Sequence, residues 1–195
     1  MTNKISERQY EIIQATGKIL TQSGVSGLTI KNLATVMKFS ESAIYRHFKS
    51  KEEIVIALLQ YLATNMDERY TKVVLSIISP EEKLIAIFKN QILFFKTNPH
   101  FVVAVFSDGL MEESVRINET ISKIMEIKNK HLLPIIKEGQ QQNIFTNEIP
   151  TEDLIHIIMG SFRLLMFKWR ASNFNFEINK SGNTMMQSIL KLIKI

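Results

Sequence analysis

The chain has 195 residues, of which 45 % are hydrophobic, and it contains no cysteine. The length suits one large or two small domains, and the hydrophobic fraction is typical of a chain that buries a core. Without cysteine, disulfides, zinc ribbons, thiol nucleophiles and iron–sulfur clusters are excluded. The longest uncharged stretch, residues 54–66, is shorter than the ~18 residues of a membrane span. The first five residues lack the apolar core of a signal peptide, so we expect a cytoplasmic protein.

The net charge of +5 lies entirely in the N-terminal quarter of the chain. Residues 1–51 contain eight Lys and Arg against three Glu, whereas the rest of the chain has equal numbers of basic and acidic side chains. A chance fluctuation in a window of this length is one interpretation. The other is that this end binds an anionic partner such as a nucleic acid.

Three segments with helical periodicity precede residue 50. Hydrophobic residues at helical spacing over residues 12–20 predict a first helix that ends at Gly24. Thr29 and Ser40 are candidate N-caps for a second helix of about eight residues and a third short one. Because helices this short are marginal in isolation, the three must pack together. Two short helices joined by a tight turn after a longer helix are typical of a helix-turn-helix DNA-binding unit.

The remainder of the chain also shows helical patterns, separated by capping boxes, prolines and a loop over residues 143–150. Ser50 and Ser79 each open a capping box, and Thr151 is expected to cap a later helix. Pro134 should kink or end the helix that contains it. The expected helices cover residues 51–76, 80–97, 100–107, 112–140, 151–171 and from about 179 onward. Residues 100–106 are rich in β-branched and aromatic side chains and Asp108-Gly109 could form a hairpin turn, but no partner strand follows, so a helix is expected there.

The predicted fold is therefore all-α, with about nine helices in two domains. Residues 1–52 form a three-helix N-terminal helix-turn-helix DNA-binding domain. Residues 53–195 form a larger helical domain, and the helix that continues to about residue 76 joins the two.

The runs Thr29–Ala34 and Ser40–Glu52 resemble the second helix, the recognition helix and the start of the fourth helix of the TetR-type transcriptional regulators. The run Tyr45-Arg46-His47-Phe48, followed by Lys51, carries most of this specificity. The resemblance covers roughly residues 8–58, and beyond it only length and the order of helices match. The resemblance implies a dimeric regulator that binds double-stranded DNA and a small effector.

The candidate DNA-binding residues lie around the third helix, whose exposed N-terminal side chains would meet base edges in a major groove. They are Thr29, Lys31, Ser40, Glu41, Ser42, Ala43, Tyr45, Arg46, His47, Lys49 and Lys51. By resemblance, Tyr45, His47 and Lys51 match positions that contact the DNA backbone. Two alternatives stay open, namely that Tyr45 packs into the small core and that His47 is a surface histidine without a function.

The sequence departs from the family pattern at two positions. Lys38 stands in the turn where the family usually has glycine, a residue that adopts a left-handed backbone without steric cost. Ser42 stands where glycine or another small residue is frequent. Together with Glu41, these departures mean that base preferences are not carried over from the family.

Residues 88–186 hold most of the phenylalanines and methionines and the single tryptophan. These side chains are sufficient to fill a helical core, and they also permit an apolar cavity. The resemblance implies an effector site between the middle helices, for which the candidates are Phe95, His100, Phe101, Asn118, Met125, His131, His156, Met159, Arg163 and Met166. The histidines share no metal-ligand spacing, so we expect neither a metal nor a cofactor.

The last two helices are expected to form the interface of a homodimer, because each carries an apolar stripe. The stripe residues are Leu154, Ile157, Ile158, Phe162, Leu165, Trp169, Met185, Ile189, Leu192 and Ile193. A two-fold dimer would read a palindromic operator.

The interpretation that best fits these patterns is a ligand-responsive DNA-binding transcriptional regulator. We expect a repressor that leaves DNA when it binds a small, largely apolar effector. We do not expect an enzyme, because the sequence shows no paired carboxylates, nucleophile triad or phosphate loop. One alternative is a helical small-molecule-binding protein without a DNA-binding role. Another, suggested by the basic charge alone, is a protein that binds anionic membrane surfaces.

Overall fold

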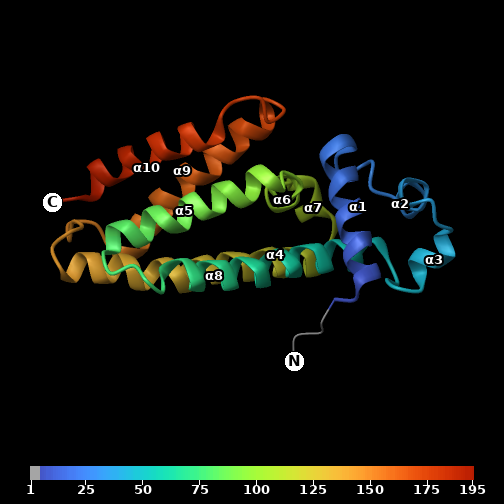
Figure 1. The fold of residues 1–195 in the computed structure, drawn as a ribbon, viewed down its shortest axis with the longest axis horizontal. Helices are drawn as coiled ribbons and strands as arrows, with labels where there is room; N and C mark the ends of the chain where they lie inside the picture. The colour runs from blue at the N-terminus through green and yellow to red at the C-terminus, as the bar shows by residue number, and fades with distance from the viewer. Residues whose placement is uncertain (1–4) are drawn as a thin grey trace. The chain divides into compact units, whose positions relative to one another are not determined.

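The computed structural model describes residues 5–195, with the backbone alone at Asp108 and Glu113. In the described chain there are ten helices and no strand (Figure 1). Phe145 and Lys194 form an isolated antiparallel bridge. The helices are α1 (Glu7–Ser23), α2 (Ile30–Met37), α3 (Glu41–Tyr45), α4 (Lys51–Val74), α5 (Pro80–Thr97), α6 (His100–Val105), α7 (Asp108–Glu113), α8 (Val115–Gln141), α9 (Thr151–Ala171) and α10 (Ile178–Ile193).

The predicted helices are confirmed, with three corrections. First, the short helix α7 was not expected, because Asp108-Gly109 reads as a turn in the sequence. Second, α8 continues for seven residues past Pro134. Pro134 removes the intrahelical partner of the Lys130 carbonyl, and both residues are exposed, so the interruption lies on a solvent-exposed part of the helix. Third, Thr151 does not cap α9, because its hydroxyl donates to Gln140 Oε1 at 2.6 Å.

The described chain divides into two compact units. The first contains the residues up to Leu62 together with Pro99–Lys123, and the second contains Ala63–Asn98 and Ile124–Ile195. The long helices α4 and α8 each contribute to both units. No described helix is long and apolar enough to cross a membrane.

The first unit is built around α1, which packs against α2 and α6 while α2 packs against α3. Ile12, Ile13 and Leu20 are buried on α1 at the predicted spacing, and Leu33 of α2 and Ile44 of α3 are fully buried as well. A core shared between helices is what allows α2 and α3 to be stable at eight and five residues.

In the second unit, α10 packs against α5 and α9. Gly182 makes the close approach of α10 to α5 possible, since a Cβ atom there would lie 2.2 Å from Ile92 Cδ1. Phe88 of α5 meets Phe162 of α9 edge-on at a ring-centroid distance of 5.2 Å, and Phe95 of α5 stacks on the same ring at 6.3 Å. The unit therefore has an aromatic centre between α5 and α9.

Candidate DNA-binding surface and effector domain

The ends of α2 and α3 are fixed by their own side chains. The Thr29 hydroxyl accepts from the backbone N–H of Asn32 at 3.0 Å, and the Ser40 hydroxyl accepts from that of Ala43 at 3.2 Å. The Ser40 and Ser42 hydroxyls also lie 2.9 Å apart. Both predicted N-caps are thus confirmed, and the backbone of α3 is held in place from its first turn.

The turn between α2 and α3 depends on a left-handed residue. Lys38 has φ 55° and ψ 42°, and the N–H of the following Phe39 donates to the Ala34 carbonyl at 2.8 Å. This is the left-handed conformation expected here, because the family usually has glycine at this position and glycine adopts it without steric cost. A non-glycine residue there costs on the order of 1 kcal/mol of conformational strain, so the unit tolerates strain in order to keep a lysine at this position.

The first helix anchors the region around α3. Ile44 and Phe48 are buried, so α3 and the residues after it are pinned to the core by two apolar side chains. The Arg8 guanidinium lies 5.0 Å from the centre of the Phe39 ring, and Gln9 Nε2 donates to the His47 carbonyl at 3.4 Å. A rigid element of this kind presents its outer side chains in fixed directions.

The outer face of this region carries the residues expected to meet DNA. Tyr45 is 49 % exposed, so its ring does not fill the core. Ala43 and Lys51 are half-buried. The remaining candidates are exposed, namely Thr29, Lys31, Ser40, Glu41, Ser42, Arg46, His47 and Lys49. The structure therefore brings the eleven candidates to the α2–α3 region and the start of α4, and leaves most of them open to a partner.

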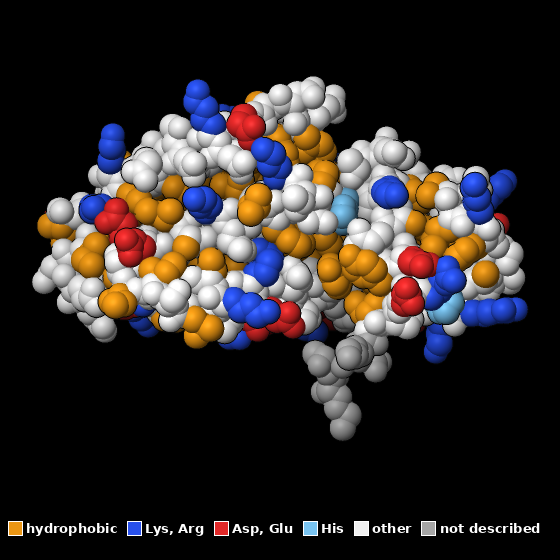
Figure 2. All heavy atoms as spheres, viewed as in Figure 1, with side chains coloured by type: hydrophobic (Ala, Val, Ile, Leu, Met, Phe, Trp, Pro, Cys, Tyr) orange, Lys and Arg blue, Asp and Glu red, His pale blue; other side chains and the backbone are white. Residues whose placement is uncertain are grey.

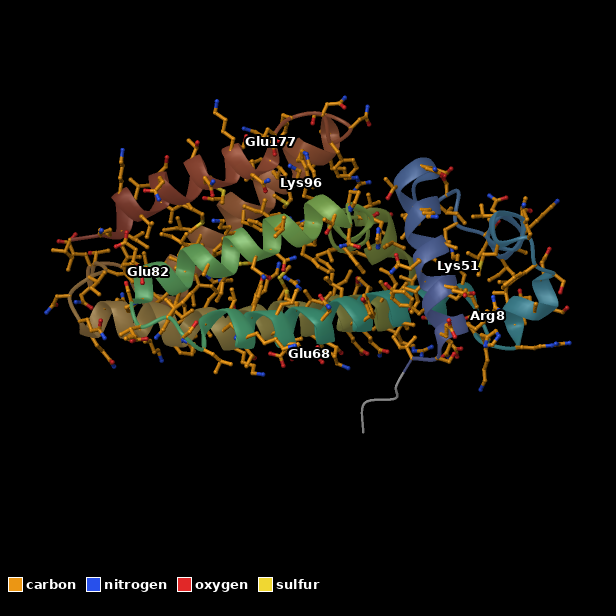
Figure 3. All side chains as sticks on the ribbon, in the orientation of Figure 1. Arg8, Lys51, Glu68, Glu82, Lys96 and Glu177 are labelled. Atoms are coloured by element: carbon orange, nitrogen blue, oxygen red, sulfur yellow. The ribbon has the colours of Figure 1, made fainter. Side chains whose placement is uncertain are left out.

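The charge of this face is predominantly positive. Lys31, Lys38, Arg46 and Lys49 are all exposed, and Figure 2 shows Lys and Arg side chains standing out from the part of the first unit that carries α2 and α3. Lys51 begins α4 (Figure 3), where the positive end of the helix dipole adds to its charge. Such a surface can bind successive phosphates through charge and hydrogen bonds.

Two family models match the chain, one for each part of it. The model of bacterial regulatory proteins of the tetR family matches residues 12–58, and the model of the C-terminal region of YsiA-like proteins matches residues 60–192. The chain belongs to the TetR family. It is a ligand-responsive, DNA-binding transcriptional regulator.

Similar proteins include other members of this architecture. The nucleoid occlusion factor SlmA of Vibrio vulnificus (strain YJ016) is 23 % identical over 176 residues, which is 90 % of each chain. The fatty acid degradation regulator FadR of Bacillus halodurans has a TM-score of 0.87 at 17 % identity and covers 96 % of this chain and 97 % of its own. FadR of Bacillus subtilis, solved with stearoyl-CoA, has a TM-score of 0.82 at 18 % identity and covers 93 % and 97 %. These two likenesses show a shared TetR-type fold.

The candidate effector residues are distributed over both units. In the first unit, His100 and Phe101 are buried on α6, whereas Asn118 is exposed. In the second unit, Phe95 and Met166 are buried, Met125, His131 and Met159 are half-buried, and His156 and Arg163 are exposed. Aromatic and thioether side chains thus reach the interior, but the exposed polar candidates do not point into it.

His131 has a structural partner. Its Nε2 lies 2.6 Å from Asp67 Oδ1, and Lys130 Nζ donates to the same carboxylate at 2.8 Å. Hydrogen bonds from Lys130 and then His131 hold the pKa of Asp67 below its usual value. The ring of His131 also meets Tyr70 edge-on at 5.4 Å, so these groups fix α8 against α4 within the second unit.

The stripe expected to form the dimer interface turns mostly inward. Leu154, Ile158, Phe162, Trp169, Ile189 and Ile193 are buried within the protomer, Leu165 and Met185 are half-buried, and Leu192 is exposed. The apolar side chains that α9 leaves outside are instead Ile157, Leu164 and Phe167, which are 45, 53 and 60 % exposed. Of these three, Ile157 belongs to the predicted stripe, whereas Leu164 and Phe167 do not, because periodicity alone cannot distinguish two apolar faces of one helix.

Proposed function

We propose that this TetR-family chain is a repressor that binds a palindromic operator as a homodimer and leaves it when a small, largely apolar effector binds. The observation that carries the DNA-binding part is the exposed basic surface built on α2, α3 and the start of α4. The excess of positive charge is confined to the N-terminal quarter of the chain. A charge that only kept the protein soluble would not need this distribution.

The surface suits a division of roles between bases and phosphates. Ser40, Ser42 and Ala43 at the start of α3 have short side chains that allow the helix backbone to approach base edges. Tyr45 and His47 at its other end, with Lys51 at the start of α4, would bind the DNA backbone and set the position of α3 in the groove. In this assignment the Glu41 carboxylate accepts a hydrogen bond from a cytosine amino group, or it repels phosphate and so disfavours other sequences.

The proposed dimer interface is the outward face of α9. Ile157, Leu164 and Phe167 recur at a spacing that places them on one side of the helix, and Gly160 between them is also exposed. Large apolar side chains in such an array are typical of protein interfaces. The proposed dimer predicts that Phe167→Glu converts the protein to a monomer in analytical ultracentrifugation, whereas Lys168→Glu, an exposed neighbour on α9, leaves it dimeric.

The effector is proposed to be a long-chain acyl compound. The second unit has an aromatic centre formed by Phe88, Phe95 and Phe162, which suits an alkyl chain. The structure of Bacillus subtilis FadR with stearoyl-CoA supports an acyl-CoA as the first compound to test. A ligand shifts the protein from its DNA-binding state only through a difference in affinity between two states, commonly ~1–3 kcal/mol.

The DNA-binding surface is tested by a Tyr45→Ala, Lys51→Ala double variant in gel-shift titrations against the promoter region of its own gene. The expected result is a large loss of affinity. Because each lost phosphate contact lowers the salt slope by about 0.9, the loss of Lys51 from both protomers should lower it by about 2. The matched control is Lys18→Ala, which removes an exposed cation of α1 outside the proposed surface.

A double variant that binds as tightly as the wild type, with the same salt slope, would show that this surface is not the DNA-binding one. If the wild type retards no DNA yet binds a small molecule tightly, the alternative of a ligand-binding protein without a DNA-binding role is correct. Binding to anionic vesicles without a preferred DNA sequence would favour the membrane-surface alternative. A regulator should prefer its operator over random DNA by about 10³ or more.

A further inference from the structure

Gln91 is a buried polar side chain in the apolar centre of the second unit. It lies on α5 between Phe88 and Phe95, one turn from each, and it is only 1 % exposed. Both phenylalanines meet Phe162 of α9, so this face of α5 is turned toward α9. A primary amide in such surroundings is costly unless its donors and acceptor are satisfied.

The orientation of the Gln91 amide is fixed by its neighbours. Arg69 Nη2 and the Tyr70 hydroxyl each donate to Gln91 Oε1 at 3.0 Å. A guanidinium has no acceptor, so the atom facing Arg69 must be the amide oxygen, and the Nε2 atom must lie on the other side. That Nε2 is buried, and no acceptor for it lies within reach among the residues that the structure describes.

Arg69 is itself held in place. Its Nε donates to Asn65 Oδ1 at 2.7 Å, Asn90 accepts from Nη1, and its guanidinium carbon lies 4.1 Å from the centre of the Phe94 ring. The side chain that orients Gln91 is therefore rigid. The two N–H bonds of Gln91 are aimed in one direction by a pre-organised network rather than by chance.

A buried cation lies on the helix that faces this network. Lys128 of α8 is 3 % exposed, and His131, one turn further along the same helix, packs against Tyr70. Burial lowers the pKa of Lys128 to about 8, and the positive charge of Arg163 on α9 acts in the same direction. The side chain is still protonated at neutral pH, so a positive charge resides in the interior of this unit.

We propose that Gln91 Nε2 and Lys128 Nζ bind the polar head of the effector, and that this head is the carbonyl or carboxylate oxygen of an acyl compound. This inference rests on the proposed function. Both groups are pure donors at neutral pH, so they match a ligand group that only accepts. A cationic head is excluded, because it would lie beside the buried ammonium. The phenylalanines that flank Gln91 then receive the alkyl chain.

The test compares two variants with matched controls. Gln91→Glu keeps an oxygen for Arg69 and Tyr70 but replaces the N–H donors with a negative charge. Lys128→Met removes the ammonium at nearly constant length. The controls are Gln141→Glu and Lys137→Met, the same changes at exposed positions of α8. Circular dichroism establishes that each variant is folded, and a gel shift on the operator establishes that it still binds DNA.

Binding is measured by isothermal titration calorimetry, and by the fluorescence of the buried Trp169, with three probes of equal alkyl length. These are palmitoyl-CoA, palmitate and hexadecyltrimethylammonium, each below its critical micelle concentration. The wild type and both controls should bind at least one of the two acyl probes and not the cationic one. Each site variant should lose about tenfold or more in affinity, the usual effect of removing a hydrogen bond to a charged or buried polar group.

The two acyl probes distinguish the source of the head group, because palmitate presents a carboxylate and palmitoyl-CoA a thioester carbonyl. Preference for either supports the inference. It is overturned if folded Gln91→Glu and Lys128→Met bind the acyl probes as tightly as the wild type, or if the cationic probe competes equally. It is also overturned if the wild type binds its operator but neither acyl probe, in which case the DNA-binding proposal still stands. If the wild type binds no operator, the proposed function itself is wrong.

Discussion

Acidification should destabilise this protein through one histidine of the first unit. His100 opens α6 and is 9 % exposed, with its ring 4.3 Å from that of Phe101. It packs so closely on Gly17 of α1 that a Cβ atom there would lie 2.5 Å from His100 Cδ2. Its Nε2 is buried with no hydrogen-bond partner among the described residues. A proton on this ring would place a charge in an apolar contact between two helices.

Burial lowers the pKa of His100 from 6.5 to about 4. Because the folded-state pKa lies below that of the unfolded chain, the unfolded chain binds more protons between these values. Stability is therefore fully present above pH 6.5 and is lost as the pH falls toward 4. At roughly 1.4 kcal/mol per pH unit, the whole interval corresponds to about 3 kcal/mol, and about 2.5 kcal/mol of this is lost by pH 4.5.

The assay is urea denaturation between about pH 7.5 and pH 4.5, followed by circular dichroism. The wild type also loses stability through carboxyls with lowered pKa values, such as Asp67, so the comparison is with His100→Leu, which should lose about 2.5 kcal/mol less over this range. The control is His156→Leu, which removes a histidine whose side chain is 84 % exposed. If His100→Leu and the wild type lose equal stability, the account of His100 is incorrect.

Three substitutions test the backbone and packing. Lys38→Gly should raise the free energy of unfolding by about 1 kcal/mol in chemical denaturation, because it relieves the left-handed strain of the α2–α3 turn; no gain would refute that strain. Gly139→Ala should destabilise by about 1–3 kcal/mol, because its Cβ atom would lie 2.1 Å from Cδ2 of the buried Phe145. Gly160→Ala meets nothing within 4 Å in its own protomer, so in the monomeric Phe167→Glu background it should raise the melting temperature through helix propensity alone; equal effects at the two glycines would contradict the packing argument.

Much of the local structure is encoded in short-range sequence features. Ser40 is followed by a helix whose start its own hydroxyl caps, and Pro80 occupies the first turn of α5, where a missing N–H costs nothing. These interactions span three or four residues, so they are readable without knowledge of the fold. Of the two outcomes predicted for Pro134, an early end of the helix is wrong, because α8 continues to Gln141. The cost of the missing hydrogen bond depends on the surroundings of the Lys130 carbonyl, which a local pattern does not reveal.

The DNA-binding candidates were also accessible from sequence. The charge excess is local to residues 1–51, and the run from Tyr45 to Lys51 resembles a known family closely enough to assign positions. The exposure of Tyr45 required the structure, because an aromatic residue next to buried Ile44 fits a core or a surface equally well.

The sequence by itself determined an all-α chain with a basic helix-turn-helix unit ahead of a neutral helical domain, because caps, periodicity and charge are properties of neighbouring residues. Only the tertiary structure decided which apolar face of α9 turns inward, leaving Leu164 and Phe167 outside. The tertiary structure was also needed to show that Gln91 and Lys128 are buried, since glutamine and lysine usually lie on the surface. Burial depends on which distant helices pack against a residue, and one helix's periodicity carries no information about its neighbours.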